Sequence, residues 1–177
     1  MTWERGVSLL RREWDRLPEA VCDAITPLVR EMMTCKEAIH QIMAEAGSES
    51  LCARCDDRCC ARGRYHVSPT DLLAFIVTRT EIFTPDFSRS SCPYLGEGGC
   101  LMAPAYRPFP CITFACEAIE DRISPLHRTR LSFLVDNLSS LYASIDSLLG
   151  RRVRGGIMHY AERNAETGEG ILLSGRS

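Results

Sequence analysis

Eight of the ten cysteines in this sequence fall into two blocks with short internal spacings. The first block holds Cys52, Cys55, Cys59 and Cys60, and the second holds Cys92, Cys100, Cys111 and Cys116. Cysteines that served only as small apolar residues would be scattered among isoleucine, valine and leucine, not paired across short polar loops. The two blocks therefore indicate thiol chemistry, either as disulfides or as thiolate ligands for a metal.

The cellular compartment decides between these two uses of cysteine. Residues 1–5 show no basic segment followed by an apolar one, so the sequence predicts no secretory signal. No stretch approaches the ~18 consecutive apolar residues of a membrane span. We therefore expect a cytoplasmic protein, in which thiols stay reduced and clustered cysteines favour metal binding. Structural disulfides and reduced cysteines without a site are the alternatives.

The spacing within the first block indicates how the thiolates would bind metal. Cys52 and Cys55 form a Cys-x-x-Cys turn, which can point two sulfurs at one ion. Adjacent cysteines project differently, so we expect Cys59 and Cys60 to serve two metals or a dinuclear site. The eight thiolates suit two four-cysteine sites or one larger cluster, with the blocks folded together. Zinc and iron, including an iron–sulfur cluster, both fit these ligands.

Other residues with reactive side chains carry weaker signals. Cys22 and Cys35 lie on apolar faces of predicted helices, and we expect both to be core residues. His66 follows the first block closely enough to be a ligand, although a lone histidine is more often structural. The sequence contains no Ser/His/Asp arrangement, phosphate loop or paired-carboxylate motif. It therefore predicts no catalytic residue and leaves enzyme activity undecided.

The pattern of apolar residues predicts a mainly α-helical single domain over residues 1–160. The expected segments are N-terminal helices over 8–46, an irregular cysteine-cluster metal module over 48–125 with little strand, and a long C-terminal helix over 128–149. The two long helices flank and cover the metal module. The polar residues 161–177 are predicted to be a disordered tail.

Two apolar seams with alternating spacings of three and four residues predict the long helices. The first seam is Ile25, Leu28, Met32, Cys35, Ile39 and Ile42, and the second is Leu131, Leu134, Leu138, Leu141, Ile145 and Leu148. Pro18 and Pro27 are expected to interrupt the N-terminal helices. Because neither long helix can bury its seam alone, we expect the two to pack together. A homodimer or a protein partner bound through the seams is the alternative.

Shorter elements are expected between the seams. Ser68 followed by Pro69 and Asp71 is typical of a capped helix start. The glycine-rich turn at 96–99 predicts a hairpin or loop that brings Cys92 and Cys100 together. A further short helix is predicted over 113–122.

The charge balance excludes some classes of partner. The chain carries 21 basic and 23 acidic residues, for a formal net charge of −2. This balance leaves no strongly basic field, so the sequence does not predict nucleic acid or an anionic membrane as a partner. Metal ions are the expected ligands.

The two blocks resemble the YkgJ-like cysteine-cluster proteins, a family described as chelating zinc or iron. The family pattern is CxxC followed by CC, then CPxL, a glycine-preceded cysteine, and RPxxC with FxC. Residues 52–116 match it with Cys52, Cys55, Cys59, Cys60, Cys92-Pro93-Tyr94-Leu95, Gly99-Cys100, Arg107-Pro108, Cys111, and Phe114-Ala115-Cys116. One departure is Ile112, where the family often has arginine.

The resemblance implies metal chelation by the eight cysteines. A similar cluster also accompanies a flagellin-lysine methylase, so the resemblance admits a modifying enzyme. Three functions therefore stand as hypotheses. They are a protein that chelates zinc or iron, a redox protein or modifying enzyme built on an iron–sulfur cluster, and a structural metal module that presents a helical interaction surface.

Overall fold

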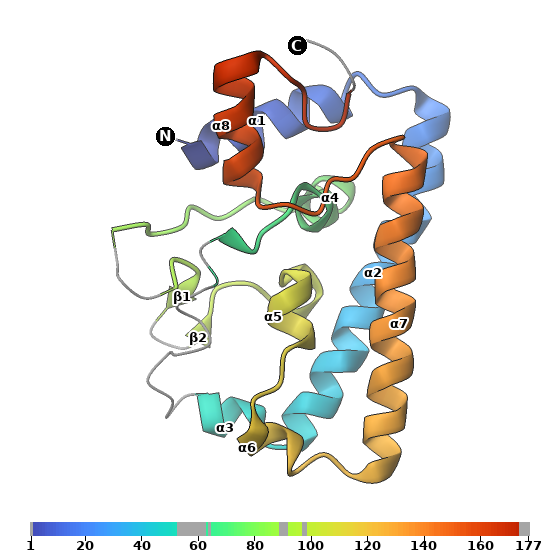
Figure 1. The fold of residues 1–177 in the computed structure, drawn as a ribbon, viewed down its shortest axis with the longest axis vertical. Coiled ribbons are helices and arrows are strands. Elements are labelled where there is room, and N and C mark those ends of the chain that lie inside the picture. The colour runs from blue at the N-terminus through green and yellow to red at the C-terminus, as the bar shows by residue number, and fades with distance from the viewer. Residues whose placement is uncertain (1, 53–62, 64, 89–91, 97–98, 174–177) are drawn as a thin grey trace.

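The computed structural model describes residues 2–52, 63, 65–88, 92–96 and 99–173. Over these residues the chain is mainly α-helical with very little strand, which confirms the predicted fold class. The elements are α1 (Thr2–Trp14), α2 (Glu19–Glu45), α3 (Ser48–Cys52), α4 (Pro69–Val77), β1 (Leu95–Gly96), β2 (Gly99–Cys100), the 3-10 helix η2 (Pro104–Tyr106), α5 (Phe109–Thr113), α6 (Glu117–Glu120), α7 (Pro125–Leu148) and α8 (Ile157–Thr167). Figure 1 shows them arranged along two long helices, α2 and α7.

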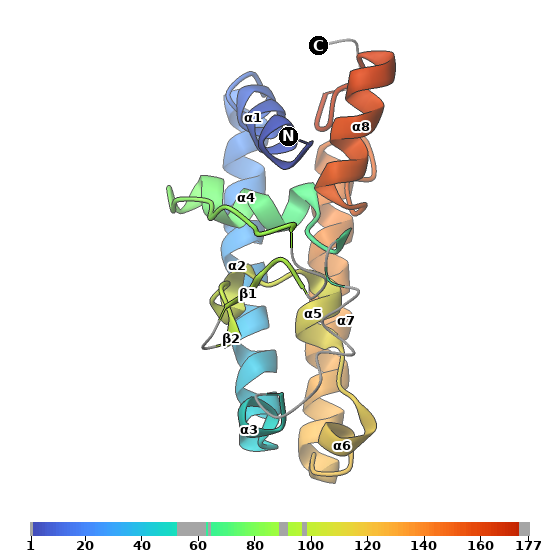
Figure 2. The ribbon, with the colours of Figure 1, turned by 90° about the vertical axis from the view of Figure 1, so that its left-hand side faces the viewer.

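The helices α2 and α7 run antiparallel and lie side by side (Figure 1, Figure 2). The predicted seams pack together over most of their length, and Met32, Ile39 and Leu138 are fully buried. The last predicted position of the second seam is wrong, because Leu148 is 41% exposed and Leu149 is buried instead. The Cys35 thiol joins the two helices directly, because it donates a hydrogen bond of 3.2 Å to the carbonyl oxygen of Leu134. The expected pairing of the seams within one chain is therefore confirmed. Although both helices are long, no described helix is apolar enough to cross a membrane.

The predicted interruption of the N-terminal helices is right at Pro18 and wrong at Pro27. Pro18 is the N-cap of α2, whereas Pro27 lies inside this continuous helix. Proline at 27 removes one N–H donor, and the carbonyl that loses its partner belongs to Asp23. Both Pro27 and Asp23 are exposed, so water can hydrogen-bond this carbonyl group. Nearby, the Thr26 hydroxyl donates a bond of 2.8 Å to the Cys22 carbonyl oxygen.

The helix α4 begins at the capped start that the sequence predicts. The Ser68 hydroxyl accepts a bond from the Asp71 N–H, and the Asp71 carboxylate accepts one from the Ser68 N–H. This reciprocal capping box satisfies backbone donors that would otherwise be unpaired at the helix start. Figure 2 shows α4 lying across the two long helices, with its N-terminal end on the side of α7. The cap therefore places a carboxylate close to both long helices.

The segments that carry the second cysteine block are short. Strands β1 and β2 pair antiparallel with Leu95 opposite Cys100, as the predicted hairpin requires. The approach of Cys92 to Cys100 stays a prediction. The helix expected over 113–122 is wrong in its extent: α5 ends at Thr113 and α6 covers only Glu117–Glu120, because Phe114 and Cys116 adopt extended backbone conformations. The Thr113 hydroxyl closes α5 by donating a 2.8 Å bond to the carbonyl oxygen of Phe109.

The prediction of a disordered tail from residue 161 is wrong for its described part. Helix α8 continues to Thr167, and Ile171 and Leu172 are almost fully buried. The buried carboxylate of Glu13 on α1 explains this order. It accepts hydrogen bonds of 2.8 Å from the N–H of Ile171, 2.5 Å from that of Leu172 and 3.1 Å from that of Leu173. One side chain thus fixes three successive backbone groups, a contact that apolar periodicity does not reveal.

Leu138 gives a direct test of the paired seams. We expect Leu138→Ala to lower the free energy of unfolding by roughly 2–5 kcal/mol, because truncation of a fully buried leucine leaves a cavity. The matched control is Phe133→Ala on the same helix, where the ring is 71% exposed and the change should stay within about 0.5 kcal/mol. Urea unfolding followed by circular dichroism measures both. Equal losses for the two variants would contradict the packing of α2 against α7.

Glu13 gives a separate test of the ordered tail. Glu13→Gln replaces a charged acceptor by a neutral one, so we expect it to reduce the unfolding free energy by roughly 1–3 kcal/mol. It should also accelerate limited proteolysis within 168–173, because these residues lose their anchor. Glu162→Gln changes an exposed carboxylate on α8 and serves as the control. Unchanged cleavage in Glu13→Gln would show that other contacts hold the tail.

Candidate functional site

The described cysteines of the predicted metal module lie on separate short elements. Cys52 ends α3, Cys92 precedes β1, Cys100 belongs to β2, Cys111 to α5, and Cys116 caps α6. Their exposure also differs, since Cys92 is buried whereas Cys52, Cys100 and Cys111 are exposed. The remaining members, Cys55, Cys59 and Cys60, lie outside the described residues, and their predicted ligand roles stay predictions.

The predicted metal-binding function is wrong for the part of the chain that the structure describes. Within it, no group of three or more histidine, cysteine, aspartate or glutamate side chains is arranged to hold a metal ion. A four-thiolate site requires sulfurs that converge on one ion, and the described thiols, which lie on separate short elements, form no such group. The iron–sulfur and structural-metal alternatives depend on the same convergence, so they lose their support as well.

The segment that follows the first cysteine block packs against two cysteines of the second block. A Cβ atom placed on Gly63 would come within 3.0 Å of the Cys92 sulfur, so the backbone of residue 63 packs closely on this side chain. Three residues later, Nδ1 of His66 lies 3.4 Å from Sγ of Cys111. The thiol and the imidazole are therefore within hydrogen-bonding distance of each other.

Backbone contacts fix the position of His66. The backbone N–H of His66 donates a 3.0 Å hydrogen bond to the carbonyl oxygen of Gly63. The backbone N–H of Ile157 donates a 2.7 Å hydrogen bond to the carbonyl oxygen of Val67. Gly156 makes the second contact feasible, because a Cβ atom there would come within 2.4 Å of the Tyr65 carbonyl oxygen. The start of α8 thus clamps residues 65–67 from one side. Desolvation in this setting lowers the pKa of His66, and the carboxylate of Asp71 acts in the opposite direction.

A fully hydrogen-bonded carboxylate lies beneath His66. One oxygen of Asp71 accepts a 2.8 Å bond from the Lys36 ammonium group and a short bond from the Tyr142 hydroxyl. The other accepts bonds of 2.9 Å from the N–H and 2.6 Å from the hydroxyl of Ser68. Across the described residues, every buried side-chain nitrogen and oxygen has a hydrogen-bond partner. The network joins α2, α4 and α7 at one point.

Lys36 and Tyr142 complete this network from the two long helices. Lys36 and Asp71 are 0% and 1% exposed, so their charges rely on each other and on neighbouring hydrogen bonds. The Lys36 nitrogen also lies 5.5 Å from the centre of the Tyr142 ring, a cation–π distance. Burial and the adjacent carboxylate of Asp71 raise the pKa of Tyr142 well above its usual value. The Tyr142 hydroxyl therefore stays protonated and donates to Asp71.

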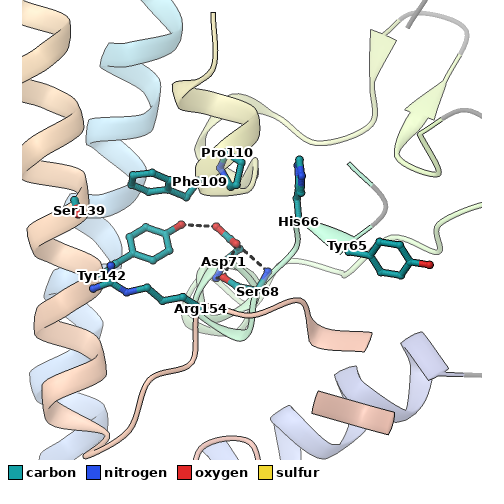
Figure 3. A pocket seen from close by; sticks show the side chains of 9 residues that line it. All are labelled: Tyr65, His66, Ser68, Asp71, Phe109, Pro110, Ser139, Tyr142 and Arg154. Carbon is teal, nitrogen blue, oxygen red and sulfur yellow. Dashed lines mark hydrogen bonds between the residues drawn. The ribbon is translucent and has the colours of Figure 1, made fainter. Parts of the chain in front are cut away.

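A cavity of about 280 Å³ opens above the network (Figure 3). Its lining residues are Tyr65, His66, Ser68, Asp71, Phe109, Pro110, Ser139, Tyr142 and Arg154. The rings of Phe109 and Tyr142 meet edge to face, with centroids 5.3 Å apart. The Arg154 guanidinium lies over the Tyr142 ring and is paired with Asp146, with its Nε atom 2.6 Å from the carboxylate. The cavity thus combines aromatic walls with a few polar groups at its edge.

Sequence reasoning missed most of this site. Asp71 was recognised only as a helix-capping acid, and neither Tyr142 nor Arg154 carried a motif. A usable signal existed at Lys36, the single lysine in the sequence. It directly follows seam residue Cys35 and shares a helix face with Met32 and Ile39, so its spacing indicates burial. A lysine in that position requires a partner, which the sequence alone does not identify.

Comparisons with known proteins give no relatives for this chain. No family model matches it, no curated protein matches it, and no solved structure resembles it. The resemblance to the YkgJ-like proteins therefore stays a prediction that rests on the cysteine spacing.

The buried network gives a stability test. Lys36→Met leaves the Asp71 carboxylate buried without its cation, so we expect a loss of roughly 3–5 kcal/mol in unfolding free energy. Adding Asp71→Asn removes the uncompensated charge and should restore part of that loss. Chemical denaturation of both single variants and the double variant measures the coupling between the two side chains. A double variant whose loss equals the sum of the single losses would contradict a direct interaction.

Proposed function

We propose that this protein binds a small, uncharged, ring-sized molecule in the cavity between α4, α5 and α7. The observation that carries the proposal is the combination in one cavity of aromatic walls and edge polar groups. Ligand sites in proteins are typically concave and mostly apolar, with a few polar groups that fix orientation. Phe109 and Tyr142 provide the apolar surfaces, and Ser139 provides a hydroxyl group (Figure 3).

The charges around the cavity support an uncharged ligand. Asp71 is neutralised by Lys36, and Arg154 is paired with Asp146. These four groups carry no net formal charge together, so the cavity offers no uncompensated ion for a charged ligand. Its volume of about 280 Å³ lies just below the ~300–1,000 Å³ typical of sites for drug-sized molecules. An uncharged molecule with one ring and a hydrogen-bonding edge suits both the charge balance and the volume of the cavity.

The network beneath the cavity supports a preformed site. Asp71 joins three helices through short hydrogen bonds, so the walls contributed by α4 and α7 are held in register. A preformed site does not lose affinity to ordering its own side chains on binding. We also place the protein in the cytoplasm, where its cysteines would stay reduced.

Binding of phenol tests this proposal. Titration of isotope-labelled protein with phenol should shift the backbone amide signals of Tyr65, His66 and Asp71 in a saturable manner. Ser139→Phe fills the cavity and should abolish these shifts, whereas Ser140→Phe, on the neighbouring exposed position, should leave them intact. Circular dichroism confirms that both variants are folded. Absence of saturable shifts in the unaltered protein, or equal shifts in both variants, would overturn the proposal.

A further inference from the structure

We propose that a second cavity, between the end of α1 and the end of α4, binds a free α-amino acid with an apolar side chain. The helices α1 and α4 pack against each other (Figure 2). The cavity has a volume of about 310 Å³, and its lining residues include Arg11, Asp15, Phe75, Ile76, Arg79 and Glu81. It is separate from the cavity of the proposed function, so this inference does not depend on that function.

The charged side chains at this cavity carry the inference. Arg11, Asp15, Arg79 and Glu81 are all exposed, and they carry no net formal charge together. Among the residues that the structure describes, none of the four makes an ion pair or a side-chain hydrogen bond. The cavity of the proposed function differs in this respect, because its charged groups are paired with each other. Two cations and two anions that remain unpaired at one cavity match a ligand that carries both charges.

Arg79 adopts a backbone conformation that suits glycine. Its φ of 55° lies in the left-handed region, which residues with a Cβ atom rarely adopt. It directly follows Thr78, the C-cap of α4. The N–H of Arg79 donates a 3.1 Å bond to the carbonyl oxygen of Ile76, and that of Thr80 donates a 2.9 Å bond to the carbonyl oxygen of Phe75. Glycine is the usual residue at this position of such a helix end. The chain therefore keeps a guanidinium group where the backbone favours glycine, as strained residues at binding sites do.

Contacts with η2 fix the loop that carries Arg79. The hydroxyl oxygen of Thr80 lies 3.1 Å from that of Tyr106 and 2.8 Å from that of Thr78. The ring of Tyr106 also packs on that of Phe75, with centroids 4.3 Å apart. The backbone at the end of α4 is thus held in place without a ligand. A ligand that binds there does not have to order this segment, which favours its affinity.

The chemistry of the lining residues selects the class of ligand. A carboxylate fits the guanidinium groups of Arg11 and Arg79, which can donate paired hydrogen bonds. An ammonium group fits the carboxylates of Asp15 and Glu81. A simple anion would meet these two carboxylates without compensation, and a simple cation would meet the two guanidinium groups. The ring of Phe75 supplies an apolar surface for the ligand side chain. A zwitterionic amino acid satisfies all of these groups.

Titration with L-leucine tests the class of ligand. Leucine should shift the backbone amide signals of Phe75, Ile76 and Thr80 in isotope-labelled protein, and the shifts should saturate. N-acetylleucine lacks the ammonium group and leucinamide lacks the carboxylate, so each should bind at least about tenfold more weakly. Absence of saturable shifts with leucine, or equal affinity for the three compounds, would overturn the proposal.

Arg79→Gly separates binding from stability. Glycine adopts the left-handed conformation without strain, so the midpoint of urea unfolding should not decrease. The affinity for leucine should fall at least about tenfold, because a guanidinium group is lost. Unchanged leucine affinity would overturn the proposal. A decrease in both the affinity and the unfolding midpoint would give Arg79 a structural role and would also overturn its assignment to the ligand.

A pair of neighbouring arginines provides the matched control. Arg11→Gln should weaken leucine binding, whereas Arg12→Gln changes an exposed neighbour outside the cavity and should leave binding unchanged. Equal losses in the two variants would show that net charge sets the affinity, and would overturn the cavity as the site. Ser139→Phe, which fills the other cavity, should leave leucine binding intact. Leucine binding and phenol binding can therefore fail independently of each other.

Discussion

The carboxylate of Asp71 is the constraint on which the rest of the structure depends. It caps α4 through Ser68, pairs with Lys36 on α2 and accepts the hydroxyl hydrogen of Tyr142 on α7. Three elements far apart in the sequence therefore meet at one buried charge. A buried ion pair contributes little net stability when compared with apolar residues of the same size, because removing both charges from water is costly. Its main effect here is geometric, since only one relative placement of the three helices satisfies all of these bonds.

That placement also determines what the surface can do. With α4 fixed across the long helices, residues 65–68 run above the network, and the start of α8 approaches them closely at Gly156. The imidazole of His66 is consequently held beside α5, where Cys111 lies. The cavity is thus bounded by α4, α5, α7 and the residues before α8. His66 and Asp71 both line the cavity, so the cavity and the buried network belong to one continuous arrangement.

Local periodicity predicted the fold better than it predicted the site. The seams through Met32 and Leu138 and the cap at Ser68 follow from short-range patterns that the final structure keeps. Pro27 failed as a helix breaker because its lost hydrogen bond lies on an exposed side of α2, where water can replace it. The tail failed as a disordered segment because Glu13, more than 150 residues away, binds its backbone. The cysteine blocks predicted convergent ligands, yet the described members lie on separate elements. Solvent access decided the outcome at Pro27 and a long-range contact decided it in the tail, and neither can be read from residue spacing.

The burial of Lys36 has a consequence for covalent modification. It is the single lysine among 177 residues, and its ammonium group has no exposed surface. Acylation, methylation or attachment of a tag protein at a lysine side chain therefore cannot occur on the closed molecule. An amine-selective reagent would modify residue 36 only when the contact between α2, α4 and α7 opens. The rate of that labelling is a built-in measure of how often the core of this protein becomes accessible to solvent.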